Sequence, residues 1–507
     1  MLSRLITAIL YPYAKFALRK RDPIVQQAQA LHHLLTHAQN TQFGRDYYFK
    51  NILAKDDFVK AYQQIVPARK YVDFDDYMKR IIAGDADVLW PGKPSYFVKS
   101  SGLTSDASKL IPWTDDHTKL FNRTSFQQFL YHVSQCPGSS LLNGKFLVLT
   151  ATAHMDDVNG IKTTYMSGLL KYLSPDFSSR YIFPTKKTAN ETDYEVYVEK
   201  AIEETRHQDV RLLSGVPPVL KHFIEKILTA TGKKTLRELW PNIQVVSLSG
   251  SNPEFYVEDF QRLIGDDNYQ LWNIYGASEG GQFAHNHYDD DYRHLYLNMN
   301  AGIFYEFIRA DQFGSDKAKR YWIADIIEGK HKKPDEAEPD LVFVLSSVQG
   351  FWSYVVGDVI KFIDTQKLII QYVGRLTGSL TKYDERITEY QTDQAFQQAN
   401  KQFDCQLEHY HGTYSDKGDH IVFYCEFQNA PDDLAAYAST LDQQLRGLNC
   451  DYDYARKFLI TAAQVESVPA NTFFNTIKSQ QRLNGHFKVL KLSEATHYAK
   501  LLLNDRK

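Results

Sequence analysis

The feature that most constrains the fold is an alternation of short apolar runs with longer amphipathic segments through the middle of the chain. Short apolar runs are typical of buried strands, and apolar residues that recur every three or four positions are typical of helices. The expected strands lie at 146–149, 243–248 and 271–275, and the expected helices include 216–228 and 256–264. This alternation predicts an α/β architecture in which helices cover sheets.

The pattern changes after about residue 380. It then predicts a helix, two strands, a second helix and a strand, at 388–401, 405–411, 421–427, 433–448 and 463–468. The second helix carries an apolar stripe formed by Leu434, Tyr437, Ala438, Leu441, Leu445 and Leu448. We therefore predict a large multi-sheet α/β domain over residues 1–380 and a smaller α+β domain over 381–507.

Neither of two apolar stretches fits a membrane-spanning helix. Residues 5–10 are too few to cross a bilayer, and no small-residue cleavage site follows them. The longest uncharged run, 341–357, is interrupted by serine, glutamine and glycine, so two strands joined by a turn fit it better. After the first stretch, Asp22 and Pro23 are typical of an N-cap and a first-turn proline, and they predict a helix that continues to Ala38.

Charge and cysteine content argue against several functional classes. The chain has 58 Lys and Arg against 61 Asp and Glu, a net charge of −3, so no overall field attracts it to nucleic acid or to an anionic membrane. Its four cysteines form no CxxC pair and no zinc-finger array. So few cysteines in so long a chain favour a reducing compartment, and we expect a cytoplasmic protein without membrane insertion.

The segment from Ser100 to Lys109 has the composition of a phosphate-binding loop. It holds five hydroxyl side chains, one glycine and a terminal lysine. Hydroxyls and backbone N–H groups donate to phosphate oxygens, and the lysine adds charge, so we expect a strand-to-helix loop around a polyphosphate. It is not a Walker A loop, because GxxxxGK[ST] is absent. The alternative is a Ser/Thr-rich surface turn.

A second candidate is the turn after the expected strand 271–275, which carries Ser278 and Glu279. Ligands of α/β sheets lie at the carboxyl ends of strands, and a carboxylate there suits Mg²⁺ shared with phosphates. The alternative is a tight turn with a solvated glutamate. Further along, Asp358 and Arg375 suit the hydroxyls of a ribose, although such residues in turns are usually structural.

One cluster of histidines and aspartates follows the Glu279 turn. It comprises His285, His287, Asp289, Asp290, Asp291 and His294. Close His and Asp side chains bind transition metals, but a solvated polar loop is the commoner arrangement. We therefore expect the loop and keep the metal site as the alternative.

Taken in order, these segments resemble the acyl-acid-amido synthetases named for auxin-responsive plant proteins, a family with bacterial members within the adenylate-forming superfamily. The resemblance runs from about residue 40 to the end. It rests on the motifs at 88–92, 109–112, 215–217, 239–242, 275–280, 302–307, 354–359, 374–375 and 485–488. Each motif is weak alone, and the ordered set is specific.

The resemblance implies roles for particular residues. The ATP- and AMP-binding set would be Ser100, Ser101, Gly102, Thr104, Lys109, Ser249, Gly250, Ser251, Tyr275, Gly276, Ala277, Ser278, Asp358 and Arg375. Glu279 would hold Mg²⁺, and Lys488, on a mobile C-terminal domain, would reach into the site during adenylation. The chain departs from the family pattern at Leu103, Ser353, Asp384 and Leu490.

The implied function is a ligase that uses ATP and Mg²⁺. It would join a small carboxylic acid to AMP and then transfer the acyl group to an amino acid or amine, forming an amide. Two alternatives stay open: transfer to a thiol such as coenzyme A, and a catalytically decayed relative that only binds nucleotide or acid.

Overall fold

The structure is a computed structural model, and it describes ten stretches of the chain. These are residues 2–19, 21–99, 109–250, 253–315, 318–376, 378–380, 382–383, 385, 387–479 and 489–504. Several expected site residues therefore lie outside the described residues, namely Ser100, Ser101, Gly102, Thr104, Ser251 and Lys488, as do the departures Leu103 and Asp384.

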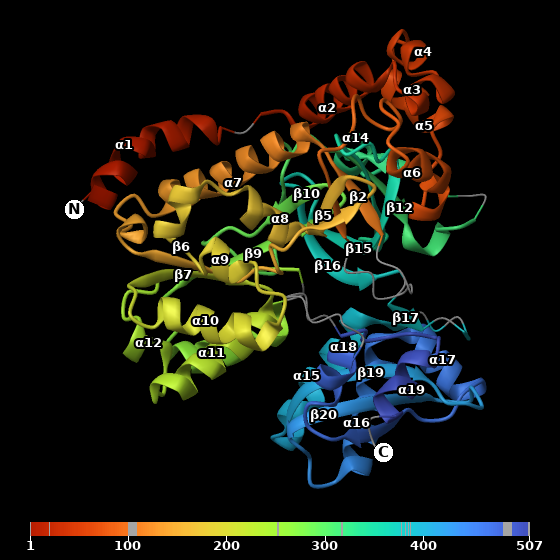
Figure 1. Cartoon of the computed structure of the whole chain (residues 1–507). Coiled ribbons are helices and arrows are strands. Elements are labelled where there is room, and N and C mark those ends of the chain that lie inside the picture. Colours follow the sequence, from red (N-terminus) through yellow and green to blue (C-terminus); the bar gives the residue numbers. More distant parts are fainter. Residues whose placement is uncertain are drawn as a thin grey trace. The chain divides into compact units, whose positions relative to one another are not determined.

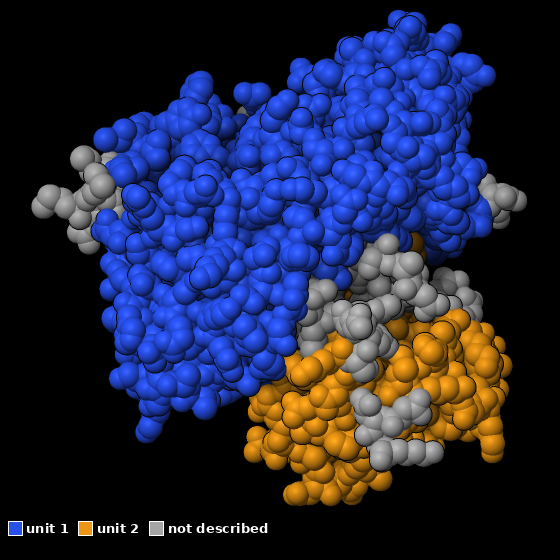
Figure 2. Space-filling model, in the orientation of Figure 1, with its two compact units in different colours: residues 1–101, 107–356, 360–371 blue, residues 102–106, 357–359, 372–507 orange. Residues whose placement is uncertain are grey.

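The described residues form two compact units, which Figure 2 colours separately. The first comprises the residues up to 356 together with 360–371, and the second comprises 357–359 and the residues from 372 onward. The domain boundary expected after residue 380 stays a prediction.

Within the described residues, one sheet of twelve strands dominates the fold. Its order begins with β13 (Arg320–Trp322), β12 (Phe304–Arg309), β14 (Leu341–Ser346), β15 (Tyr354–Asp364), β16 (Ile369–Arg375) and β11 (Leu295–Leu297). It continues with β10, β9, β8, β7, β3 and β6 (Ile182–Phe183). Five of its strands, β6, β3 (Lys145–Val148), β7 (Val210–Gly215), β8 (Val245–Ser249) and β9 (Gln270–Ala277), pair in parallel. The pairing becomes antiparallel at β10 (Gly281–His285). These strands confirm the three strands expected at 146–149, 243–248 and 271–275.

Helices cover the parallel part of this sheet. Figure 1 shows α7 (Asp115–Gln135) on one side of β7, and α10 (Tyr194–Thr205) and α11 (Pro217–Thr231) on the other. The helices α11 and α13 (Val257–Ile264) confirm two expected ones. The α/β architecture is thus the one that the alternating pattern indicates.

A smaller sheet has the order β2, β1, β5, β4. Here β1 (Tyr96–Lys99) pairs antiparallel with β2 (Leu110–Trp113), with Lys99 opposite Leu110. The remaining strands are β4 (Asp156–Val158) and β5 (Ile161–Tyr165).

Two apolar segments have the structures expected for them. Asp22 caps α2 (Pro23–Ala38) by accepting a hydrogen bond of 2.9 Å from the N–H of Ile24. The run 341–357 forms β14 (Leu341–Ser346), a turn and the start of β15 (Tyr354–Asp364), as predicted. None of the helices in the described stretches is long and apolar enough to cross a membrane.

The second unit has its own core. A sheet with the order β19 (Gln406–Tyr414), β20 (Ile421–Asn429) and β21 (Gln464–Val468) is accompanied by α15 (Glu389–Phe403) and α16 (Leu434–Leu448). All five elements confirm the expected ones, and Tyr437, Leu441 and Leu445 of the apolar stripe are fully buried.

Candidate active site

Two neighbouring parallel strands end where the expected nucleotide residues lie. Ser249 is the last residue of β8 and lies opposite Ile274 of β9, so it is next to the end of β9 that carries Tyr275, Gly276 and Ala277. Gly250 follows with φ +84°, a left-handed conformation that suits glycine. The carboxyl ends of β8 and β9 therefore bring these candidates to one edge of the sheet.

The hairpin of β9 and β10 favours glycine at two positions beside its turn. Gly281 has φ +88° and pairs with Ala277. A Cβ on Gly276 would lie 2.2 Å from the carbonyl oxygen of Gly281, closer than any side chain can approach. The small residues of this segment thus allow a tight hairpin that presents Ser278 and Glu279.

Three side chains from the stretch after β14 hold this turn. The hydroxyl of Ser347 donates to the carbonyl oxygen of Glu279 over 3.1 Å. The side-chain amide of Gln349 donates to the carbonyl oxygen of Ser278 over 2.7 Å. The hydroxyl of Tyr354, the first residue of β15, donates to Oε1 of Glu279 over 3.1 Å. Backbone and carboxylate of the turn are therefore both fixed.

Glu279 is a buried carboxylate, and the described part of the chain provides it with no ion pair. It is only 7% exposed. A carboxylate removed from water needs a compensating positive charge or several hydrogen bonds, and one neutral phenol supplies little of that. Its oxygen atoms suit a hard cation such as Mg²⁺. The donor chemistry at Glu279 therefore fits the metal that the sequence implies.

Tyr71 interacts with both Lys109 and Glu279. The ammonium group of Lys109 lies 5.4 Å from the centre of the Tyr71 ring, and the Tyr71 hydroxyl donates to the carbonyl oxygen of Leu110 over 2.8 Å. Burial, with smaller contributions from the charges of Asp75 and Glu279, raises the pKa of Tyr71 to about 12. The structure thus places Lys109 against an aromatic side chain whose pKa also responds to the charge of Glu279.

The expected strand-to-helix geometry of the phosphate loop is wrong. The loop joins β1 to β2, which are antiparallel neighbours, so it connects two strands. The helix α7 begins later because Leu110–Trp113 forms the strand β2. Thr114 then caps the helix by accepting a hydrogen bond of 3.1 Å from the N–H of His117.

The expected ribose-binding pair is formed in the second unit. Asp358 lies on β15, and Arg375 ends the neighbouring strand β16 (Ile369–Arg375). Oδ1 of Asp358 is 3.1 Å from Nε of Arg375. Gly357, with φ +92°, precedes the aspartate, and its carbonyl oxygen accepts from the N–H of Leu376 over 2.7 Å. These bonds fix the carboxylate and the guanidinium on adjacent strands.

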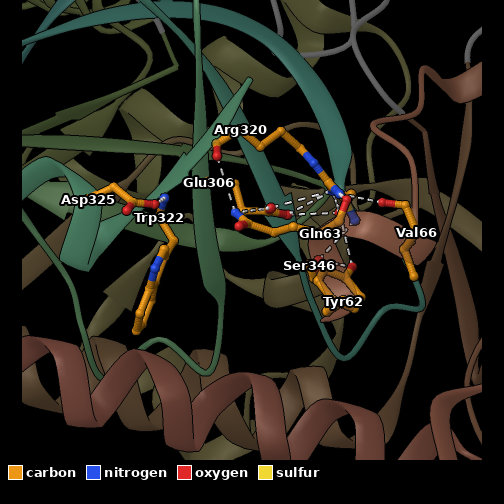
Figure 3. Close-up of polar contacts among 9 residues, drawn as sticks. Tyr62, Gln63, Val66, Glu306, Arg320, Trp322, Asp325 and Ser346 are labelled. Atoms are coloured by element: carbon orange, nitrogen blue, oxygen red, sulfur yellow. Dashed lines mark hydrogen bonds and ion pairs between the residues drawn. The ribbon is translucent and has the colours of Figure 1, made fainter. Parts of the chain in front are cut away.

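Ser353, the residue before Tyr354, takes part in a buried polar network, of which Figure 3 labels Glu306, Arg320 and Ser346. Its hydroxyl donates to Glu306 over 2.8 Å, and its backbone N–H donates to Ser346 over 2.9 Å. Glu306 lies on β12 (Phe304–Arg309) and is fully buried. Arg320, the first residue of β13 (Arg320–Trp322), is 3.4 Å from Glu306 and also contacts the Ser353 hydroxyl. A cation on another strand thus neutralises Glu306.

The segment that follows Lys488 is bound to the second unit. Lys491 pairs with both carboxylate oxygens of Asp393, at 2.6 and 2.7 Å, and its carbonyl oxygen accepts from the N–H of Gly412 over 2.7 Å. Leu490 is buried, and its carbonyl oxygen accepts from Nδ1 of His411 over 2.6 Å. Lys491, three residues after the expected catalytic lysine, is therefore anchored to the second unit by these bonds.

The His and Asp side chains after the turn bind one another and the backbone. Nδ1 of His294 and the hydroxyl of Tyr296 both bond to Asp290, at 2.9 and 2.8 Å. Nδ1 of His285 bonds to the carbonyl oxygen of Asn286 at 2.9 Å. In the part of the chain that the structure describes, no group of three or more His, Cys, Asp and Glu residues has a metal-binding arrangement.

Sequence reasoning missed the residues that support the turn. Tyr71, Ser347 and Gln349 carry no motif signal, because their role depends on contacts made between distant segments. Tyr354 opens a segment that the sequence singles out, but only Asp358 of that segment is expected to bind a ligand.

Two family models match the sequence of the chain. The family model described as the GH3 family N-terminal domain matches residues 13–200, and the GH3 family C-terminal domain matches residues 390–497. No curated protein sequence matches the chain significantly.

Solved structures share its fold over almost the whole length. A GH3.15 acyl acid amido synthetase is 17% identical, with a TM-score of 0.76 over 95% of this chain and 94% of that one. AtGH3.15 acyl acid amido synthetase in complex with 2,4-DB is 16% identical, with a TM-score of 0.72 over 96% and 97%. A 2-hydroxyisobutyryl-CoA ligase in complex with 2-HIB-AMP is 12% identical, with a TM-score of 0.60 over 95% and 91%. These similarities confirm the expected fold, a large multi-sheet α/β part with a smaller C-terminal domain.

Proposed function

Because the chain belongs to the GH3 family, we propose that it is an ATP-dependent ligase that adenylates a carboxylic acid and transfers the acyl group to an amino acid or another amine. The observation that carries the proposal is Glu279, a carboxylate 7% exposed on the hairpin after β9, with no cation paired to it among the described residues. The similarity to an acyl acid amido synthetase supports the same activity.

The first step joins the acid to AMP. A carboxylate oxygen attacks the α-phosphorus of ATP, the bond from that phosphorus to the bridging oxygen breaks, and pyrophosphate leaves. Two anions approach each other and negative charge grows on the phosphoryl oxygens, so positive groups at fixed positions lower the barrier. Mg²⁺ held by Glu279 would supply such charge. The ammonium groups of Lys109 and Lys488 would add further positive charge that stabilises the phosphoryl oxygens.

The second step forms the amide. The amine nitrogen attacks the acyl carbonyl carbon, the bond to AMP breaks with its electron pair on the phosphate oxygen, and the nitrogen releases a proton. The intermediate reacts with water, so the site must exclude water until the acceptor has bound. Lys488 would serve the first step and withdraw for the second, with the anchor at Lys491 limiting how far it travels.

The remaining candidates would hold the nucleotide. We assign Ser100, Ser101, Gly102 and Thr104 to the phosphates, Ser278 to the α-phosphate, Ser249, Gly250 and Ser251 to the adenine, and Asp358 and Arg375 to the ribose. Tyr275, Gly276 and Ala277 would complete the nucleotide site. The pair of Asp358 and Arg375 supports the last assignment, because a carboxylate fixed by a guanidinium accepts hydrogen bonds from two hydroxyls.

The test is a screen of carboxylic acids for acid-dependent pyrophosphate release with ATP and Mg²⁺. An active acid is then incubated with amino acids, amines or coenzyme A, and the product is identified by mass. An amide supports the proposal, and a thioester indicates the thiol-transferring alternative. If no acid in a broad panel causes release while ATP still binds, the chain is a decayed relative and the proposal fails.

Two variants connect the activity to the site. Glu279→Gln should abolish pyrophosphate release, and Lys488→Ala should do the same while ATP still binds. Glu204→Gln is the matched control, since Glu204 accepts hydrogen bonds from the backbone and hydroxyl of Thr185 and the hydroxyl of Thr188. The control should keep its activity, and equal losses in all three variants would contradict the assignment.

A further inference from the structure

The helix α1 (Leu2–Ala17) packs one face against the rest of the protein. Figure 1 shows it next to α7, and Leu10, Ala14 and Leu18 contact the α7 residues Leu130 and Val133. The hydroxyl of Thr7, fully buried, donates to the carbonyl oxygen of Pro137 over 2.9 Å. The helix is thus held by its inner face, and its orientation on α7 is fixed.

The opposite face of α1 exposes large apolar side chains. Ile9 is 65% exposed, Tyr13 52% and Phe16 67%. Residues spaced by four and then three positions lie on one face of a helix, so the three form a continuous stripe, which we call the outer stripe. Single exposed apolar side chains are ordinary on protein surfaces, whereas a contiguous patch indicates an interaction surface.

One basic side chain, Arg19, lies next to the outer stripe, and a second, Lys15, lies against Tyr11 of the same helix. The ammonium group of Lys15 is 4.7 Å from the centre of the Tyr11 ring, and the guanidinium of Arg19 is 5.7 Å from that of Phe16. Lys15, Arg19 and the exposed Arg21 form no ion pair within the described stretches of the chain. These cations are available to an external anion.

The charge around α1 is opposite in sign to that of the whole chain. From residue 1 to Arg21 the sequence has five basic residues and no acidic one, although the chain as a whole carries −3. An uncompensated cluster of this kind attracts a negatively charged surface from within a Debye length. Its combination with exposed aromatic and aliphatic side chains is typical of helices that lie in the headgroup region of a bilayer.

We propose that the outer stripe of α1 docks on an anionic phospholipid surface, with the helix lying parallel to the membrane. Ile9, Tyr13 and Phe16 would enter the boundary between headgroups and acyl chains. The long stems of Lys15 and Arg19 would follow the apolar surface while their charged ends reach the lipid phosphates. The proposal is independent of the catalytic assignment, because none of these residues belongs to the candidate active site.

The test is co-sedimentation of the full-length protein with phospholipid vesicles. Vesicles of phosphatidylcholine with about a third phosphatidylserine should bind the protein, and pure phosphatidylcholine should bind it far more weakly. Raising the salt concentration should release it. Phe16→Ala should weaken binding about tenfold, and Lys15→Gln with Arg19→Gln roughly 25-fold at low salt.

Phe177, on η3 (Asp176–Arg180), provides the matched control, because it is also 67% exposed. Phe177→Ala should bind anionic vesicles as the unchanged protein does, and all variants should unfold at the same temperature. Equal binding to both vesicle types, equal loss in Phe177→Ala, or no binding at all would overturn the proposal. A second copy of the chain as the occupant would instead give a dimer that Phe16→Ala dissociates, without vesicle binding.

Discussion

The Tyr354 hydroxyl donates a hydrogen bond to Oε1 of Glu279 across 3.1 Å, linking the first residue of β15 to the hairpin after β9. Tyr354 is fully buried, and its ring packs 4.6 Å from that of Phe351. Packing therefore restricts the orientation of the Tyr354 side chain. Through its hydrogen bond, Tyr354 holds in position the Glu279 carboxylate that we assign to Mg²⁺.

Tyr354→Phe should weaken catalysis while leaving the fold intact. The variant removes one hydrogen bond, worth about 1 kcal/mol, so pyrophosphate release should fall roughly fivefold to tenfold. The Mg²⁺ concentration needed for half-maximal rate should rise, because the carboxylate is no longer held. Tyr305→Phe is the control, since Tyr305 is equally buried and donates to the backbone oxygen of Asn298 over 3.0 Å. An unchanged Mg²⁺ dependence in Tyr354→Phe would contradict this role.

Arg320→Met should destabilise the protein more than the double variant Arg320→Met with Glu306→Gln does. Removing the guanidinium leaves the fully buried Glu306 without its cation, which costs about 3–5 kcal/mol. Arg320→Met combined with Glu306→Gln removes both charges and should recover much of that loss. Urea unfolding of the three proteins measures the effect. If the single variant is as stable as the double, Arg320 does not neutralise Glu306.

Much of this architecture is predictable because it depends on local patterns. The period of apolar residues indicates the helices and strands, and the cap at Asp22 indicates where α2 begins. The hairpin at Ser278 and Glu279 follows from its small residues and the strand before it.

The features that the sequence does not predict depend on contacts between distant segments. No spacing in the sequence indicates that Arg320 neutralises Glu306, or that Gln349 binds the carbonyl oxygen of Ser278. The strand that follows the phosphate loop is not predictable from the sequence for a related reason. The composition of the loop indicates phosphate binding whether a strand or a helix follows, so only the pairing of β1 with β2 decides the geometry.

Lys491→Met should slow adenylation without unfolding the second unit. Lys491 pairs with Asp393 three residues after Lys488, so losing the pair should leave Lys488 poorly positioned for adenylation. We expect pyrophosphate release to fall about tenfold, with ATP affinity and circular dichroism unchanged. Lys500→Met, at an exposed position on α19 (His497–Asn504), should have no effect. Equal rates in the two variants would exclude the anchoring role.

Buried histidines predict a loss of stability in acid. Burial lowers the pKa of His117 to about 3 and that of His132 to about 4, against an ordinary 6.5. The unfolded chain therefore binds more protons below pH 6.5, and the stabilisation present above that pH is lost as the pH falls towards about 4 for His132 and about 3 for His117. Each histidine contributes a slope of up to about 1.4 kcal/mol per pH unit. As the pH is lowered, the free energy of unfolding of His117→Leu should fall less steeply than that of the unchanged protein, because the contribution of one histidine is lost. The same slope in both proteins would contradict the prediction.

The most direct test of the proposed chemistry is exchange of labelled pyrophosphate into ATP, measured with an active carboxylic acid. Exchange reports acyl adenylate formation alone, whichever acceptor follows. We predict exchange that requires the acid and Mg²⁺, that Glu279→Gln abolishes, and that Glu204→Gln retains. Exchange at the full rate in Glu279→Gln would contradict the account, because the buried carboxylate would then have no part in the first step.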